Sequence, residues 1–374
     1  MSEYQYYEFQ AIDRPLGEDD RHALRVLSTR ARITATSFTN SYEWGDFKGD
    51  PAELMERWFD LHLYLANWGS RRLMIRLPGR LIDRRLVDRF IGGVDCVEVR
   101  IAGANLILDI ARDEVETDED WDDGSGWLAA LAPLRADLLA GDLRLFYLLW
   151  LTAVEADAFK ADDREPMPGI GPMTGALKAF ATFFGLDPDL VWAAAERPAP
   201  NSTSPDAVRK AIAAMSDGEK TAWLVRLFDG DAHALAEWRA GVRNQLTPTD
   251  ASPAAARTVG ELRSRARAIR LARERAKAEK AAAECRRLAV EAERARRVRL
   301  EAIARRGEAV WREIETEIER RNASGYDKAA ALLLDLRMIA EEAGTIAEFA
   351  RRLRTIRERH ARKERFIERL PAYQ

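Results

Sequence analysis

The chain has 374 residues, of which 47% are hydrophobic, and its formal net charge is −3. This length fits two or three domains. The chain has only two cysteines, which argues against a disulfide scaffold and favours a reducing cytoplasm. The N-terminus has no signal-peptide pattern, and the most apolar run, Leu143–Val154, is shorter than the ~20 residues that span a bilayer. We therefore expect a cytoplasmic protein with no membrane partner.

Residues 1–112 carry alternating strand and helix patterns. The stretch from Arg32 to Trp44 is rich in β-branched and aromatic residues, and residues 71–78 alternate as a strand does. Pro51, preceded by a capping Asp50, predicts the start of a helix between these strands. Two later strands are expected to form a hairpin about Gly103. The expected outcome is a mixed sheet with helices packed on it, which together with the later helices gives the fold class α+β.

Only helical patterns follow the sheet region, and Pro- and Gly-rich joints separate them. Residues 258–322 lack proline and are dominated by Ala, Arg and Glu, which predicts one long helix or two helices broken near Gly307. A helical pair joined at Gly344 ends the chain. The expected organisation is an α/β domain at 1–112, an acidic loop at 113–126, a helical domain at 127–246, a linker at 247–257, a long basic helix at 258–322 and a helical hairpin at 323–374.

Eight of the eleven residues from Asp113 to Asp123 are acidic, which raises the question of a metal site. An EF-hand loop starting at Asp118 would need Gly at its sixth position and Glu at its twelfth, where the chain has Asp123 and Ala129. We therefore predict no metal ligands here and favour a solvated, self-repelling loop. A looser cation site, and a loop that folds against the basic helix, remain the alternatives.

The sequence offers few groups with the spacing of a reactive site. The four histidines are isolated from one another and from both cysteines, and no hydrolase, zinc-protease or Walker motif is present, so we predict no cofactor and no catalytic residue. Cys96 is expected to be a buried, unreactive thiol. Tyr42, Trp44 and Asp46 lie at a strand end and are the candidates for lining a small pocket. The simpler interpretation is a set of core aromatics beside a tight turn.

Charge is distributed unevenly along the chain. Residues 257–374 hold 31 Lys and Arg against 20 Asp and Glu, whereas residues 1–256 hold 28 against 42. Most of the positive excess lies in residues 257–306, with 17 Lys and Arg against 7 Asp and Glu. Arginine can hold phosphate through two parallel hydrogen bonds, so this helix is the candidate nucleic-acid-binding element. Its candidate residues are Arg263, Arg267, Arg270, Arg273, Arg286, Arg287, Arg294 and Arg297.

A coiled coil is the competing interpretation of this helix. An a/d seam through Val259, Leu262, Ala266 and Ile269 meets Arg273 and further arginines, and a second register is mostly alanine, which buries little area. A strong zipper is therefore not expected. Two interpretations remain, a solvated spacer with at most weak self-association and a helix that contacts a polyanion.

The stretches YQYYEFQAIDRPL, LSTRARIT and YEWGDFKGDP resemble the start of an uncharacterised family of bacterial proteins, and the body and tail follow the plan of that family. The tail, YDKAAALLLDLRMIAEEAG and FARRLRTIRERHARKERFIERL, also resembles the helical C-terminal segment of bacterial SWIM zinc-finger proteins. That resemblance implies contact with nucleic acid or protein partners through a C-x-C and C-x-H zinc site. Cys96 and Cys285 are the only cysteines of this chain, so the zinc site does not carry over.

These observations predict a non-enzymatic bacterial interaction protein whose basic helical arm contacts a protein partner or nucleic acid. The alternative is an enzyme of unknown reaction with a pocket between the sheet and the helical middle, near Tyr42, Trp44 and Asp46. A deep pocket with convergent polar groups would favour the enzyme, whereas a filled, apolar junction would not.

Overall fold

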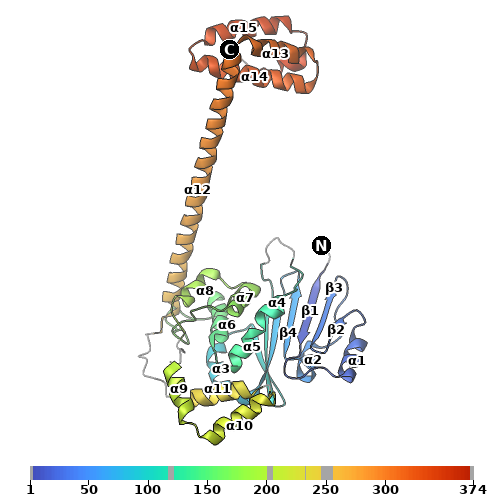
Figure 1. The fold of residues 1–374 in the computed structure, drawn as a ribbon, viewed down its shortest axis with the longest axis vertical. Coiled ribbons are helices and arrows are strands. Elements are labelled where there is room, and N and C mark those ends of the chain that lie inside the picture. The colour runs from blue at the N-terminus through green and yellow to red at the C-terminus, as the bar shows by residue number, and fades with distance from the viewer. Residues whose placement is uncertain (1–2, 117–121, 200–204, 232, 246–255, 371–374) are drawn as a thin grey trace. The chain divides into compact units, whose positions relative to one another are not determined.

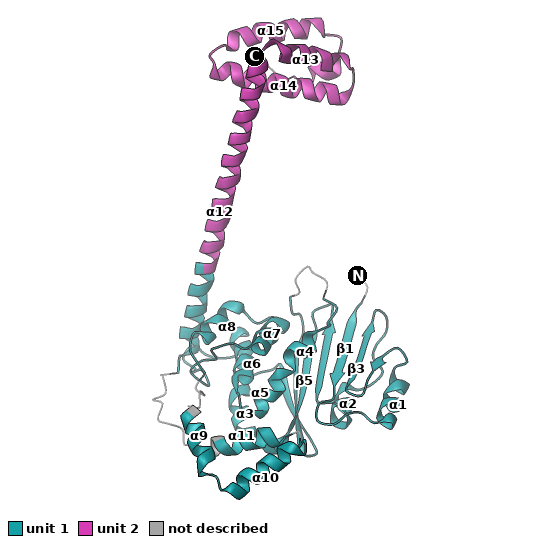
Figure 2. Ribbon diagram, in the orientation of Figure 1, with its two compact units in different colours: residues 1–272 teal, residues 273–374 magenta. Residues whose placement is uncertain are grey.

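The computed structural model describes residues 3–116, 122–199, 205–231, 233–245 and 256–370 (Figure 1). A seven-stranded sheet forms the N-terminal part, and all described elements that follow it are helices, which confirms the α+β class. The chain forms two compact units, unit 1 (residues 1–272) and unit 2 (residues 273–374), and the division falls within one long helix (Figure 2). None of the described helices is both long enough and apolar enough to cross a membrane.

The sheet has the strand order β2-β3-β1-β4-β5-β7-β6. Its strands are β1 (Gln5–Gln10), β2 (Arg32–Ile33), β3 (Ser37–Tyr42), β4 (Leu61–Ala66), β5 (Arg71–Pro78), β6 (Val97–Ala102) and β7 (Asn105–Arg112). Every neighbouring pair is antiparallel, so the sheet is not the mixed one expected from alternating strand and helix patterns. Short turns join β4 to β5 and β6 to β7, and only antiparallel neighbours can be joined in this way. The second of these turns is the predicted hairpin about Gly103, whose φ is +61°.

The two faces of the sheet are covered differently, because side chains alternate between the faces along each strand. One face is apolar and packs against the helices of unit 1 in the largest core cluster, which includes Leu63, Leu73 and Leu108. The other face is apolar only next to α1 (Glu18–Leu27) and α2 (Pro51–Arg57), where Phe9 and Met74 belong to a second core. The rest of this second face is polar.

Unit 1 contains most of the helices (Figure 1). After the turn η1 (Gly79–Leu81) they are α3 (Arg84–Ile91), α4 (Trp127–Leu131), α5 (Pro133–Leu139), α6 (Arg144–Glu155), α7 (Gly175–Phe183), α8 (Pro188–Ala195), α9 (Pro205–Ala214), α10 (Asp217–Phe228) and α11 (Ala234–Gln245). Helices α3 to α8 contribute side chains to the core cluster on the apolar face of the sheet, whereas α10 has no buried residue. In α6 all residues from Leu145 to Val154 are buried, so the most apolar run of the chain forms a core helix.

Helix α12 (Val259–Arg306) is the long basic helix. Its first turns are fixed in unit 1, because Val259, Leu262 and Ala266 are buried in the largest core cluster. The helix ends before Gly307, whose φ is +51°, so the chain has two helices with a break at the predicted position.

Unit 2 closes with a small helical core. Helix α13 (Glu308–Glu319) packs beside α14 (Ala323–Glu342), and α15 (Ile346–Arg359) and α16 (Glu364–Ile367) follow. Gly344, with a φ of +70°, separates α14 from α15, so the predicted hairpin is present. Ile314, Leu333 and Phe366 are fully buried at its centre.

Candidate functional site

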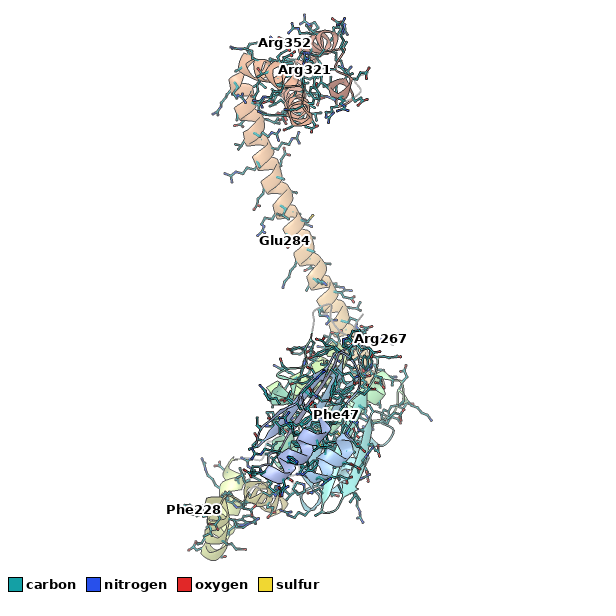
Figure 3. All side chains as sticks on the ribbon, turned by 90° about the vertical axis from the view of Figure 1, so that its right-hand side faces the viewer. Phe47, Phe228, Arg267, Glu284, Arg321 and Arg352 are labelled. Atoms are coloured by element: carbon teal, nitrogen blue, oxygen red, sulfur yellow. The ribbon has the colours of Figure 1, made fainter. Side chains whose placement is uncertain are left out.

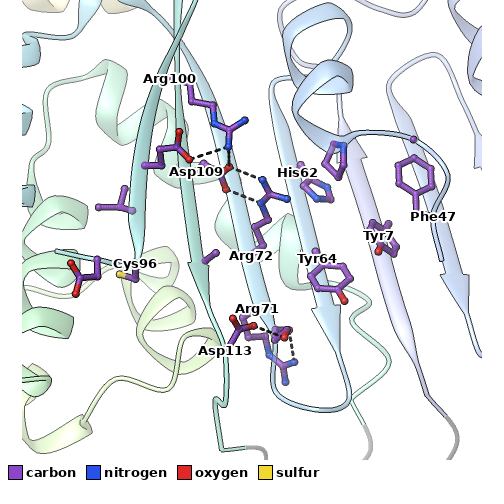
Figure 4. A pocket seen from close by; sticks show the side chains of 17 residues that line it. Tyr7, Phe47, His62, Tyr64, Arg71, Arg72, Cys96, Arg100, Asp109 and Asp113 are labelled. Atoms are coloured by element: carbon purple, nitrogen blue, oxygen red, sulfur yellow. Dashed lines mark hydrogen bonds and ion pairs between the residues drawn. The ribbon is translucent and has the colours of Figure 1, made fainter. Parts of the chain in front are cut away.

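A pocket of about 530 Å³ opens on the polar part of the sheet, on the face opposite to helices α4 to α8 (Figure 4). The register places its side chains in rows across β1, β4, β5, β7 and β6, because Tyr7 lies beside Tyr64 and Asp109 lies beside Glu98. The lining residues are Tyr7, Phe47, Gly49, Pro51, His62, Tyr64, Ser70, Arg71, Arg72, Asp95, Cys96, Val97, Glu98, Arg100, Asp109, Ala111 and Asp113.

Aromatic side chains line one side of this sheet-face pocket. The rings of Tyr7 and Tyr64 lie 4.7 Å apart, and Phe47 lies 5.1 Å from Tyr7, measured between ring centres. Both tyrosine hydroxyls donate to Oε1 of Gln5, at 2.8 Å and 3.2 Å. Burial raises the pKa of both hydroxyls, so they remain protonated donors at neutral pH.

Charged side chains line the opposite side (Figure 4). Arg72 donates two hydrogen bonds to Asp109, at 2.7 Å and 2.6 Å, and the Asp109 side chain is only 5% exposed. Arg100 lies 3.7 Å from the same carboxylate and donates to Glu98 at 3.0 Å. This bidentate geometry holds Asp109 in place, so its carboxylate is already committed to two guanidinium groups.

His62 lies between the aromatic and the charged side and is fully buried. Its Nδ1 lies 3.1 Å from the carbonyl oxygen of Glu8, which can only accept, so Nδ1 carries the proton and Nε2 holds a lone pair. Nε2 has no hydrogen-bond partner among the described residues. Burial lowers the pKa of His62 to about 3, so the ring is neutral and takes up no proton near neutral pH.

The three residues predicted to line a pocket stand outside this lining. The Tyr42 ring packs edge-on against Tyr7 at 5.8 Å, so it supports the aromatic side from behind. Asp46 accepts from Nε2 of Gln5 at 3.1 Å and therefore connects to both pocket tyrosines through that residue. Trp44 is 79% exposed. Of the three, Tyr42 contacts a lining residue directly, Asp46 is connected only through Gln5, and none lines the pocket.

The enzyme interpretation placed its pocket at the junction between the sheet and the helices. This junction contains core side chains. Leu63, Leu73, Leu108 and Phe180 are at most 1% exposed there. Cys96 lies at the rim of the sheet-face pocket, and its sulfur is 3.2 Å from the hydroxyl of Thr152. Burial raises the pKa of the Cys96 thiol, which opposes formation of a thiolate at neutral pH.

The acidic segment is only partly described, since residues 117–121 lie outside the described ranges, including the expected loop start at Asp118. Of its described members, Asp122 accepts from the backbone of Gly124 and from the indole of Trp127, and Asp123 accepts from Ser125. These carboxylates shape the turn that leads into α4. Within the described ranges, no group of three or more His, Cys, Asp or Glu side chains is placed to hold a metal ion.

The arginines at the base of α12 are largely bonded within unit 1. Arg263 donates to the carbonyl oxygen of Val154 at 2.6 Å and lies 2.7 Å from Asp157. Arg270 bonds to Asp187 and Asp189. Arg267 is exposed and has no ion pair with another described residue. These three arginines of one helix therefore differ in their availability to a partner.

Further along α12, every residue from 270 to 299 is exposed, and side chains stand out from the helix around Glu284 (Figure 3). Arg287 lies 3.7 Å from Glu284 and Arg297 lies 3.6 Å from Glu301, both at one-turn spacing. Such exposed pairs contribute at most about 1 kcal/mol each. Arg286 and Arg294 have no ion pair in the described part of the chain, and Arg273 is exposed with a partner of its own.

Sequence reasoning did not identify the residues that form the sheet-face pocket, although one signal was present. In the strand LHLYLA the leucines take one face and His62 and Tyr64 take the other, which is the period-two alternation of a half-polar sheet. Arg72 and Asp109 likewise lie on the polar face of the sheet, in strands β5 and β7. Their pairing could not be read from the sequence, because the register of distant strands is not encoded locally.

Comparisons with protein-family models, with curated proteins and with solved structures found no match to this chain.

Proposed function

We propose that this chain is a non-enzymatic interaction protein whose exposed basic helix contacts a polyanion, with nucleic acid as the favoured partner. The observation that carries the proposal is the run 270–299, in which every residue is exposed and eleven Lys and Arg stand against five Asp and Glu. At 1.5 Å per residue this run is about 45 Å long. It presents several cations to phosphate groups at once, and the release of counterions then favours binding.

The availability of these cations supports the proposal. Five of them, all exposed, have no ion pair with another described residue, namely Arg275, Lys277, Lys280, Arg286 and Arg294. Aromatic side chains are absent from the whole of 270–299, so bases have nothing to stack on in this run. Contact through backbone phosphates, without base specificity, is the mode that this composition favours.

The alternative is an enzyme that uses the sheet-face pocket. Four of its titratable groups argue against acid–base chemistry there, because their pKa values move away from neutrality. Burial lowers the pKa of His62 to about 3 and raises those of Tyr7, Tyr64 and Cys96. A general acid or base works best with a pKa close to the operating pH. The pocket therefore supports binding better than catalysis, which is consistent with an interaction protein.

The test is binding of the full chain to a duplex DNA of random sequence at several salt concentrations. We expect affinity to fall steeply as salt rises, with a slope that becomes shallower by about 0.9 for each contacting cation that is removed. The decisive variant replaces the five cations without described partners by glutamine, which preserves helix propensity. It should bind the duplex at least about tenfold more weakly at low salt.

A matched control replaces five exposed arginines of the unit 2 helical core by glutamine, at Arg312, Arg321, Arg354, Arg362 and Arg365. This variant loses the same charge and should keep most of the affinity. Equal losses in both variants would show a net-charge effect without a site on α12. No binding of the wild-type chain at low salt would refute the proposal.

A further inference from the structure

Strand β6 forms an open edge of the sheet. It is the last strand in the order, and its only described neighbour is β7, whereas the opposite edge is β2 with two residues. The Ala111 backbone N–H donates to the Cys96 carbonyl oxygen at 2.9 Å, so Cys96 and Ala111 form a hydrogen-bonded pair. Since such pairs alternate along an antiparallel ladder, Glu98 and Arg100 also bond to β7.

The backbone groups of Val97, Val99 and Ile101 therefore point away from β7. No backbone hydrogen bond from another described segment reaches them. An edge of this kind is a template for a further strand, unless charges or distortions prevent pairing. The side chain of Ile101 is 77% exposed, which is unusual for isoleucine in a strand.

The side chains of β6 have an internal symmetry about Val99. Glu98 and Arg100 flank it with opposite charges on the pocket face of the sheet, and Val97 and Ile101 lie one position further out along the strand. A strand with this pattern is complementary to its own copy when the two run antiparallel. A two-fold axis at Val99 then places position 98 of each copy opposite position 100 of the other, so opposite charges face each other.

We propose that β6 pairs with β6 of a second copy of this chain, antiparallel and centred on Val99. Val99 then faces Val99 of the second copy, and Val97 faces its Ile101, and these are the positions whose backbone groups point outward. Glu98 lies directly opposite Arg100 of the second copy, at both ends of the pairing. These two positions form the pairs without backbone bonds, in which side chains approach most closely.

Neighbouring registers are disfavoured by charge. If one strand shifted by one position, the backbone groups that point away from β7 in one copy would face groups of the other copy that already bond to its own β7. A shift of two positions places Glu98 opposite Glu98, or Arg100 opposite Arg100, and like charges directly opposite destabilise a sheet. The register centred on Val99 is therefore the one that satisfies both the backbone groups and the charges.

The proposed interface is small, since β6 has six residues. Interfaces below about 1,200 Å² are mostly weak and transient, so we expect a monomer–dimer equilibrium that depends on concentration. The closed two-fold pairing uses the same edge on both copies and stops at the dimer. This inference does not depend on α12, and polyanion binding does not depend on it.

Sedimentation velocity of the full chain from micromolar to millimolar concentration tests the pairing. The wild type should shift from monomer to dimer. Glu98→Arg alone and Arg100→Glu alone each place like charges opposite at both ends, and should weaken dimerisation by about tenfold or more. A mixture of the two single variants should form a heterodimer, because each Arg pair then faces a Glu pair. The double variant Glu98→Arg, Arg100→Glu should dimerise as the wild type does.

Arg100 also lies near Asp109, so its replacement changes a contact inside the unit as well as the proposed interface. A backbone variant therefore provides a second test that leaves these charges unchanged. Val99→Pro removes an outward N–H, which edge strands tolerate, and should also weaken dimerisation. Thermal unfolding verifies that each variant folds. A wild type that stays monomeric at millimolar concentration would overturn the proposal. So would a dimer that neither Glu98→Arg nor Val99→Pro weakens, or a mixture of single variants that does not associate.

Discussion

Arg257 connects the start of α12 to the core of unit 1, and its replacement by methionine tests how that connection is stabilised. Its guanidinium lies 3.0 Å from Glu165, whose side chain is 0% exposed, and donates to the Ala193 carbonyl oxygen at 2.7 Å. Removing one partner of a buried ion pair leaves an uncompensated charge and typically costs about 3–5 kcal/mol. Glu165 keeps two donors, the Tyr147 hydroxyl at 2.7 Å and the Arg257 backbone N–H at 2.8 Å. We therefore expect the lower end, about 3 kcal/mol.

The assay is urea unfolding followed by tryptophan fluorescence, to which Trp150 contributes, since it is 3% exposed and its ring lies 5.2 Å from Tyr147. Arg265→Met is the matched control. Arg265 pairs with Glu196 at 2.5 Å, but the two side chains are 51% and 38% exposed, so solvent screening should make its loss much smaller than that of Arg257.

Adding Glu165→Gln to Arg257→Met removes the buried carboxylate charge, and this double variant should regain part of the lost stability. A loss below about 1 kcal/mol in Arg257→Met, or a loss equal to that of the control, would refute a stabilising buried ion pair at this position. A double variant no more stable than Arg257→Met would refute it as well.

Two further predictions follow from buried titratable groups. Burial lowers the pKa of His62 from 6.5 to about 3, so between these values the unfolded chain binds a proton that the folded chain does not. The free energy of unfolding should then fall by up to about 1.4 kcal/mol per pH unit as pH decreases below about 6.5. His62→Phe should remove this contribution between about pH 6.5 and 5.5, and equal slopes in both proteins would contradict the assignment. Because burial also raises the pKa of Cys96, whereas Cys285 is exposed on α12, a thiol reagent at neutral pH should modify Cys285 at least about tenfold faster. Peptide mass spectrometry over time measures both rates, and comparable rates would contradict burial of Cys96.

Features that depend on a few consecutive residues were predicted from the sequence. Asp50 accepts from the backbone N–H of Ala52 at 2.8 Å and Pro51 opens α2, as the capping pattern predicted. Gly103 and Gly344 both have positive φ, at the expected hairpin turn and at the expected end of a helix. Such positions are encoded locally, since glycine adopts the left-handed region without the strain that a side chain adds.

Features that depend on distant residues were not predicted. The sheet-face pocket requires Arg72 to meet Asp109, 37 positions later, and the aromatic side requires Gln5 to meet Tyr64, 59 positions later. The sequence placed Arg263 and Arg270 on one basic helix. It could not show that Val154, Asp157 and two other carboxylates fold against them, because the pairing of separate elements is decided by packing over the whole unit.

The ion pairs show which part of the chain holds positive charge that is not neutralised within the molecule. Residues 307–374 hold 14 Lys and Arg against 13 Asp and Glu, and pairs such as Glu308 with Arg352 and Glu315 with Arg359 join α13 to α15. The cations at the base of α12, including Arg270, bond mostly within unit 1, so the uncompensated excess lies on the exposed run beyond Arg270. A duplex lies against one side of a straight helix and can reach only about half of the eleven cations of 270–299, which limits the salt slope to about −5. A steeper measured slope would require phosphate contacts from a second surface, and would show that α12 alone does not account for binding.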